Sequence, residues 1–143
     1  MPDVPRLYDT MLAEHLASNR QMAFVSGPRQ VGKTTTCRNQ AEVCLNWDDA
    51  DDRGILLGGS RLLAERLGLG RLRERPLVAL FDELHKHPRW KQQLKGFFDT
   101  YADQVRILVT GSSRLDTYRR AGDSLMGRYF LYRMHPITVA ETI

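Results

Sequence analysis

The chain has 143 residues, 42% hydrophobic and 27% charged, which is typical of one soluble globular domain and too short for two full ones. Its net charge of +4 comes from basic residues that are mostly scattered singly, so it gives only weak support for a nucleic-acid partner. The sequence has no apolar run near the ~18 residues of a membrane span and no secretory leader, which argues against a membrane protein and predicts a cytoplasmic one.

Five short apolar runs predict β-strands, with helical segments between them. In chain order we expect the strands at residues 22–25, 43–47, 77–81, 105–109 and 129–132. The third run is apolar at every position, as in a strand that is covered on both faces of a parallel sheet.

The segments between these runs predict crossover helices at residues 9–20, 33–42, 62–67 and 88–102. The last segment carries an apolar stripe at helical spacing, which indicates core packing rather than a ligand site. The stripe consists of Trp90, Leu94, Phe97, Phe98 and Tyr101. Alternating strands and helices with right-handed crossovers predict a doubly wound α/β domain with a parallel sheet and helices on both faces.

Residues 27–35 read GPRQVGKTT, which fits the phosphate-binding pattern G-x-x-x-x-G-K-[ST] between a predicted strand and a predicted helix. Gly27 and Gly32 let the backbone wrap so that N–H groups point at phosphate oxygens. Lys33 is expected on the β- and γ-phosphates, the Thr34 hydroxyl on Mg²⁺, and Thr35 is a weaker candidate. The variable positions of the loop are Pro28, Arg29, Gln30 and Val31.

Asp82 and Glu83 follow the all-apolar third strand. In open α/β sheets, ligands bind beyond the carboxyl ends of the strands. We therefore expect Asp82 to bind Mg²⁺ and Glu83 to orient or deprotonate an attacking water. Two adjacent acids favour hydrolysis over transfer to an acceptor, and the alternative is a pair of solvated acids at a strand end.

The sequence VTGSS ends the fourth strand, and its small hydroxyl groups are further candidates. Thr110 or Ser112 could contact the γ-phosphate or the attacking water, and an N-cap with a turn before a helix from Arg114 is an equal alternative. Arg128, just before the fifth strand, could reach the triphosphate in its own subunit or in a neighbour, although spacing alone supports this weakly.

Several other residues have simpler interpretations. His85 and His87 lack a third ligand at metal-like spacing, so a zinc site is not expected. Cys37 and Cys44 are expected to be reduced and structural. Trp47 is expected to pack in the core, followed by a solvated acidic turn at Asp48 and Asp49.

Five segments together resemble the predicted AAA+-type ATPases of bacteria and archaea, a branch near the STAND and archaeal ATPases. They read GPRQVGKTT, NWDDADDR, LFDELHKHPRW, VTGSS and SLMGRYFLYRMHPIT, and the resemblance extends from about residue 7 to residue 141. It implies a P-loop core with a catalytic glutamate and five strands in the order 5-1-4-3-2. It also implies a sensor-like segment at residues 110–112 and a functional arginine at Arg128.

The resemblance implies ATP and Mg²⁺ as cofactors, and ATP rather than GTP because the sequence has no N-K-x-D guanine motif. We expect a helical lead-in at residues 1–20, the ATPase core at 21–136 and the start of a linker at 137–143. In the family a C-terminal domain follows, so we expect this chain to be a fragment or a truncated product without the helical lid of typical AAA+ proteins.

The leading hypothesis is an Mg²⁺-dependent ATPase that drives a conformational change in an attached domain or protein partner, with a homo-oligomer as a further option. A slow nucleotide-gated switch, a nucleic-acid-linked motor and a small-molecule kinase are the alternatives. The positive charge alone supports the motor, and the pair Asp82 and Glu83 disfavours the kinase.

Overall fold

A computed structural model describes residues 6–26, 33–69, 75–111, 125 and 127–133, with the backbone alone at residues 6–8 and 33–36. The expected linker at residues 137–143 lies outside this part. The elements, in chain order, are α1 (Arg6–Ser18), β1 (Met22–Ser26), α2 (Lys33–Gln40), β2 (Val43–Asn46), α3 (Ala50–Leu57), α4 (Ser60–Leu67), β3 (Leu77–Asp82), the 3₁₀ turn η1 (Leu84–Lys86), α5 (Trp90–Tyr101), β4 (Val105–Thr110) and β5 (Tyr129–Arg133).

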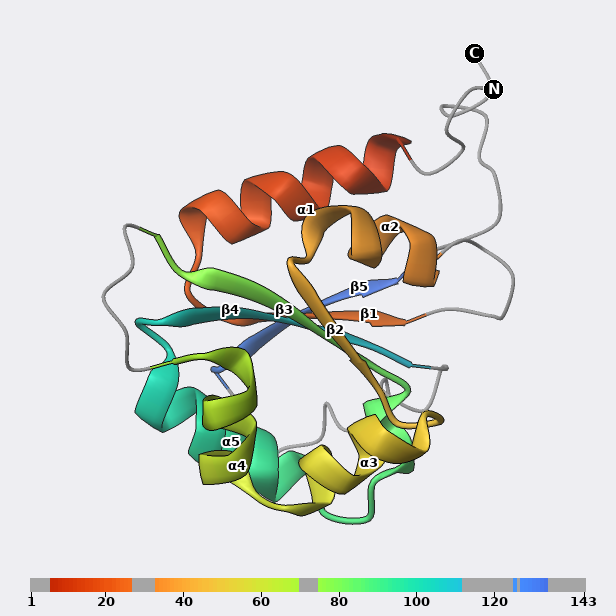
Figure 1. The fold of residues 1–143 in the computed structure, drawn as a ribbon. Coiled ribbons are helices and arrows are strands. Elements are labelled where there is room, and N and C mark those ends of the chain that lie inside the picture. Colours follow the sequence, from red (N-terminus) through yellow and green to blue (C-terminus); the bar gives the residue numbers. More distant parts are fainter. Residues whose placement is uncertain (1–5, 27–32, 70–74, 112–124, 126, 134–143) are drawn as a thin grey trace.

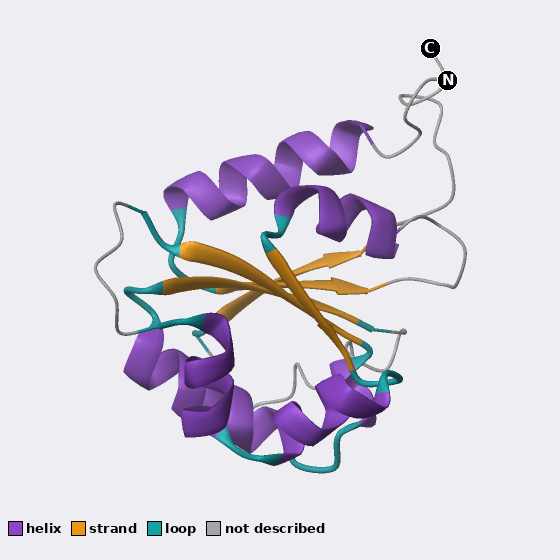
Figure 2. Ribbon diagram, viewed as in Figure 1, coloured by secondary structure: helices purple, strands orange, loops and turns teal. Residues whose placement is uncertain are grey.

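The strands form one parallel sheet in the order β2-β3-β4-β1-β5. This confirms the predicted fold class and the order 5-1-4-3-2. Each predicted strand agrees with the observed one to within one residue at either end. Helices α1 and α2 cover one face of the sheet, and α3, α4 and α5 cover the other (Figures 1 and 2).

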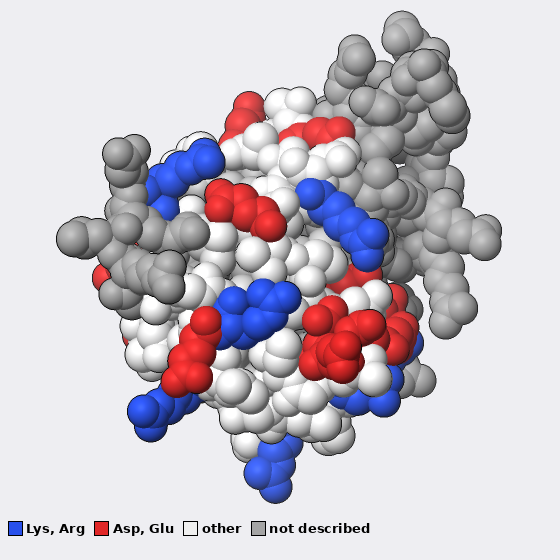
Figure 3. Space-filling model, viewed as in Figure 1, with Lys and Arg blue, Asp and Glu red and all other residues white. Residues whose placement is uncertain are grey.

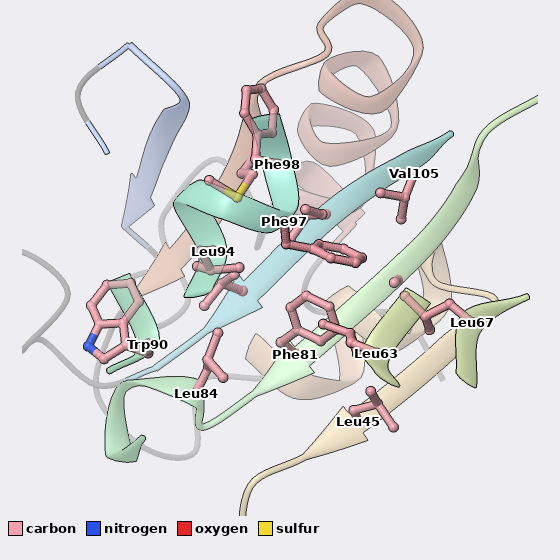
Figure 4. Packing of buried hydrophobic residues seen from close by; sticks show 14 of the residues in the cluster. Leu45, Leu63, Leu67, Phe81, Leu84, Trp90, Leu94, Phe97, Phe98 and Val105 are labelled. Atoms are coloured by element: carbon pink, nitrogen blue, oxygen red, sulfur yellow. The ribbon is translucent and has the colours of Figure 1, made fainter. Parts of the chain in front are cut away.

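Each face of the sheet has its own hydrophobic core, because side chains alternate along a strand. On β1, Met22 and Phe24 belong to the larger cluster, while Ala23 and Val25 belong to the smaller one beneath α1 and α2. The larger cluster contains the predicted stripe of α5 and packs against β3 and β4 (Figure 4). There the ring of Phe97 lies edge-on to Phe81 with 6.3 Å between ring centres.

Helix α3 was not expected, because its sequence, ADDRGILL, follows what was interpreted as an acidic turn. The acids begin this helix: the side chain of Asp49 accepts a hydrogen bond from the backbone N–H of Asp52 at 3.0 Å. Asp51 and Asp52 also lie in the first turn, where negative charge favours a helix. Acidic side chains gather over this part of the molecule in Figure 3. The other predicted helices are present, with ends that differ by a few residues.

Helix α1 is connected to the edge strand β5 through a buried histidine. His15 Nε2 lies 2.7 Å from the carbonyl oxygen of Gln21, and Nδ1 lies 2.8 Å from the hydroxyl of Tyr132. Because a carbonyl oxygen only accepts, Nε2 donates and Nδ1 accepts from Tyr132. Burial is the main cause that lowers the pKa of His15 below 6.5. No helix in the described part of the chain is long and apolar enough to cross a membrane.

Protonation of His15 should destabilise the fold. The unfolded chain binds this proton near pH 6.5 and the folded chain binds it only at lower pH. The stabilisation is therefore present above pH 6.5 and is lost as the pH falls through the folded-state pKa. Urea unfolding across this range should show a lower free energy of unfolding at acidic pH, with a smaller decrease in His15→Gln. Parallel curves for the two proteins would contradict this assignment.

Candidate functional site

Three strands end together at one edge of the sheet. Strand β1 ends at Ser26, β3 at Asp82 and β4 at Thr110, and the register pairs Thr110 with both Val25 and Asp82. Backbone hydrogen bonds continue beyond the strands, from Glu83 N to Thr110 O at 3.1 Å and from the N–H of residue 111 to Val25 O at 3.2 Å. The end of β1, the acids Asp82 and Glu83, and Thr110 therefore lie together at the carboxyl edge of the sheet.

The glycine-rich loop at residues 27–32 lies outside the described residues, and so do Ser112 and the side chains of Lys33, Thr34 and Thr35. What is described is the chain on each side of the loop. Strand β1 leads into it at Ser26, and helix α2 begins at Lys33. The strand before the glycine-rich segment and the helix after it, which the phosphate-binding pattern requires, are therefore both present in the fold.

Asp82 is buried and has a fixed orientation. Asp82 is 5% exposed, and the hydroxyl of the fully buried Thr110 donates a hydrogen bond to its Oδ1. Its backbone carbonyl accepts from the N–H of Trp47 at 3.0 Å, which ties the end of β3 to the end of β2. The observed partner of Thr110 is thus Asp82, while a contact of Thr110 with a phosphate or water stays a prediction.

The donor chemistry at Asp82 fits Mg²⁺, which prefers oxygen ligands and is usually bound by one or two carboxylates together with substrate phosphates. Among the described residues, no group of three or more His, Cys, Asp or Glu side chains could hold a metal ion. A single buried carboxylate at the edge where β1 ends can supply one oxygen ligand, so an Mg²⁺ ion there would need further ligands from other groups.

Glu83 has an unusual backbone conformation, with φ 61° and ψ 26°, and it is the one non-glycine residue with positive φ in the described part of the chain. This left-handed conformation costs an L-residue roughly 1–2 kcal/mol. Its carboxylate Oε2 lies 3.6 Å from His85 Nε2 and 3.7 Å from Lys86 Nζ. Lys86 Nζ in turn donates to both carboxylate oxygens of Asp48, at 2.9 and 3.0 Å.

These contacts were not anticipated from the sequence. Asp48 follows β2, and Lys86 lies in η1 directly after β3, so the pair forms only because β2 and β3 are neighbours. Trp47 adds a second connection, because its ring stacks on His87 with 5.0 Å between ring centres. Arg53 lies over the same indole and donates from Nε to the Trp47 carbonyl at 2.8 Å. Trp47 is partly buried and packs against the larger hydrophobic cluster, so the expected packing is observed at the margin of the core.

Arg128 lies at the amino ends of the strands, opposite to the carboxyl edge that holds Asp82 and Thr110. Its backbone carbonyl accepts from the N–H of Met22, the first residue of β1. Its side chain donates to Asp99 of α5, from Nε to Oδ1 at 2.8 Å and from a terminal nitrogen to Oδ2 at 3.1 Å. These hydrogen bonds lower the pKa of Asp99.

Arg128 lies beside Met22, the first residue of β1. The length of β1, about 13 Å at 3.3 Å per residue, separates Met22 from Ser26, the last residue before the glycine-rich segment. The structure therefore does not bring Arg128 together with Asp82, Glu83 and Thr110. The hypothesis that Arg128 reaches a triphosphate in its own subunit is not supported by this position. A role on a neighbouring subunit stays a prediction.

The chain is similar to one protein family and to solved structures. A family model described as an AAA domain matches residues 19–143. A solved structure of C. elegans PCH-2 aligns with a TM-score of 0.49 and 15% identity, over 94% of this chain and 40% of that chain. The chain thus spans less than half of the PCH-2 chain. No curated protein matches it.

Removal of the Thr110 hydroxyl should destabilise the protein, because the buried Asp82 loses a hydrogen-bond donor. Thr110→Val is expected to lower the free energy of unfolding by about 1.5–3 kcal/mol, the range for hydrogen bonds to charged groups. Thr110→Ser retains the hydroxyl and serves as the matched control. Equal urea unfolding midpoints for the two variants would show that the hydrogen bond contributes little.

Replacement of Glu83 by glycine should stabilise the fold, because glycine adopts positive φ without the Cβ penalty. We expect Glu83→Gly to exceed Glu83→Ala in free energy of unfolding by about 1 kcal/mol. Alanine is the control, since it also lacks the carboxylate but retains Cβ. If the two variants unfold at the same urea concentration, the left-handed conformation is not strained.

Proposed function

The chain belongs to the AAA domain family, and from this premise we propose that it binds ATP and hydrolyses the bond between its β- and γ-phosphates with Mg²⁺. The observation that carries the proposal is the buried carboxylate of Asp82, oriented by Thr110 at the edge where β1 enters the glycine-rich loop. A buried charge is costly unless it is partnered. A fixed carboxylate at this edge suits the metal of a bound nucleotide.

In this proposal the glycine-rich loop and Lys33 bind the β- and γ-phosphates, and the amino end of α2 contributes its partial positive charge. Thr34 and Asp82 would hold Mg²⁺, which, when bound, neutralises charge on the phosphates. Glu83 would orient the attacking water and accept its proton. Thr35 remains a weaker candidate, and Thr110 or Ser112 could contact the γ-phosphate or the attacking water.

The energy of hydrolysis would drive a conformational change in an attached domain or a protein partner. Arg128 could act on a neighbouring copy in a homo-oligomer, because its bidentate contact with Asp99 lies at the edge away from its own candidate site. Its activation of a neighbour would require Arg128 to leave Asp99.

A slow nucleotide-gated switch is the second candidate, and one observation favours it. The carboxylate of Glu83 lies within 3.7 Å of the Lys86 ammonium rather than standing apart as a solvated base. A base in that position would leave ATP bound for longer before hydrolysis.

The test is ATP binding and phosphate release with Mg²⁺ by the wild-type chain, Lys33→Ala and Glu83→Gln. We expect Lys33→Ala to abolish binding, because its ammonium bridges the phosphates. Glu83→Gln should retain binding and lose hydrolysis about 100-fold or more, as general-base removal typically does. Lys95→Met, an exposed change on α5, is the control.

Three results would separate the alternatives. Full hydrolysis by Glu83→Gln would overturn the assignment of the base. Tight binding with negligible release by the wild type would favour the slow switch. ATP binding that Lys33→Ala leaves intact would contradict the phosphate-loop assignment itself.

A further inference from the structure

Helix α1 is held on the sheet by few buried side chains. Among the residues of α1 whose side chains are described, Leu12 and His15 are the buried ones, at 1% and 2% exposure. From this arrangement we propose that α1 is a detachable helix controlled by His15: protonation of the imidazole releases α1 from the sheet, while the sheet itself stays folded. The inference goes beyond the proposed function, because it concerns a movement of the fold and needs no nucleotide.

The first observation is how little apolar surface holds α1. Leu12 is its one buried member of the smaller cluster in the described part of the chain, and Met11 and Leu16 pack beside it with part of their surface exposed. The larger cluster on the other face draws buried residues from α3, α4 and α5 together. Elements with few buried apolar contacts open locally at a lower free energy than the core does. Helix α1 is therefore suited to open before the sheet unfolds.

The second observation is a pair of polar contacts at the end of α1. His15 lies in the last turn of the helix. Its Nε2 donates to the carbonyl oxygen of Gln21 at 2.7 Å, directly before β1, and its Nδ1 accepts from the hydroxyl of Tyr132 on β5 at 2.8 Å. Both ring nitrogens of the neutral imidazole are thus used to hold α1 against the start of β1 and against β5.

The third observation is that the surroundings of His15 oppose a second ring proton. A protonated Nδ1 can only donate, so it cannot accept from Tyr132. Burial is the main cause that lowers the pKa of His15; the hydrogen bond to Gln21 raises it, and the positive charge of Arg106 on β4 lowers it further. On β5 the imidazole faces the rings of Phe130 and Tyr132, at 5.2 and 5.4 Å between ring centres, and neither ring is an anion at neutral or acidic pH.

These observations set the direction of the effect. The released helix binds the proton near pH 6.5, and the docked helix binds it only at lower pH. The equilibrium therefore moves toward release as the pH falls below 6.5, by up to about tenfold for each pH unit, until the pKa of the docked imidazole is reached. Release would uncover the part of the smaller cluster that Leu12 covers, where Ala23, Val25 and Leu108 lie.

Amide hydrogen exchange, followed by NMR on this chain from about pH 7.5 to about pH 5, tests the proposal. We expect the amides of α1 to be roughly 100-fold less protected than those of β3 and β4 at each pH, after correction for the intrinsic exchange rate. Below pH 6.5 the protection of α1 should decrease by up to about tenfold per pH unit. The amides of β3 and β4 should still be protected at the acidic end of this range.

His15→Gln is the decisive variant, because glutamine can still donate to the Gln21 carbonyl but does not titrate. It should remove the pH dependence of exchange in α1. His87→Gln, which changes another buried histidine, should retain it. Equal protection of α1, β3 and β4 would show that α1 leaves only with the whole fold, and an unchanged pH dependence in His15→Gln would show that another group titrates. Either result would overturn the proposal.

Two further variants test the surroundings of His15. Arg106→Gln removes the positive charge, and Tyr132→Phe removes the hydroxyl that donates to Nδ1, so both should raise the pKa of the docked imidazole toward 6.5. The total loss of α1 protection over the same pH range should then be smaller in both variants than in the wild type, because it depends on the difference between the docked and released pKa values. An NMR titration of the His15 ring measures the docked pKa directly. A value at or above 6.5 in the wild type would overturn the proposal.

Discussion

Parallel pairing of β1, β3 and β4 in a single register is the constraint on which the candidate site depends. Because parallel strands finish at the same edge, residues distant in sequence, such as Asp82 and Thr110, become neighbours. The backbone hydrogen bond from Glu83 to Thr110 continues the register past the strand ends. The site is therefore a consequence of the sheet, and the packing of helices on both faces stabilises that sheet.

Two adjacent carboxylates at this edge have different surroundings. Asp82 is buried and takes a hydrogen bond from Thr110, so its position is fixed by the core. The side chain of Glu83 is 29% exposed, its backbone is left-handed, and its carboxylate lies 3.6 Å from His85 Nε2 and 3.7 Å from Lys86 Nζ. Pairs of acids in unlike environments commonly take unlike roles. The buried acid suits the metal site proposed for Asp82, and the more exposed acid suits the base proposed for Glu83.

Much of this arrangement could be predicted from the sequence, because periodic apolar runs and a strand-loop-helix motif are local signals. The five strands agree to within a residue. Helix α3 was missed because no helix was expected after the acidic turn at Asp48 and Asp49, although Asp49 is a good N-cap residue. The pair of Lys86 and Asp48 could not be predicted from local patterns, because it joins two segments that follow different strands. The remote position of Arg128 could have been predicted, because a residue that precedes a strand of a parallel sheet lies away from the carboxyl edge.

In the proposed function, Asp82 completes an ATP and Mg²⁺ site at the carboxyl edge of the sheet. This role is tested most directly by calorimetric titration of ATP with and without Mg²⁺, in the wild-type chain and in Asp82→Asn, which retains the shape and an acceptor for Thr110. We predict that Mg²⁺ strengthens ATP binding to the wild type and that the substitution removes this gain while the fold is retained. An equal response of the two proteins to Mg²⁺ would show that Asp82 does not bind the metal.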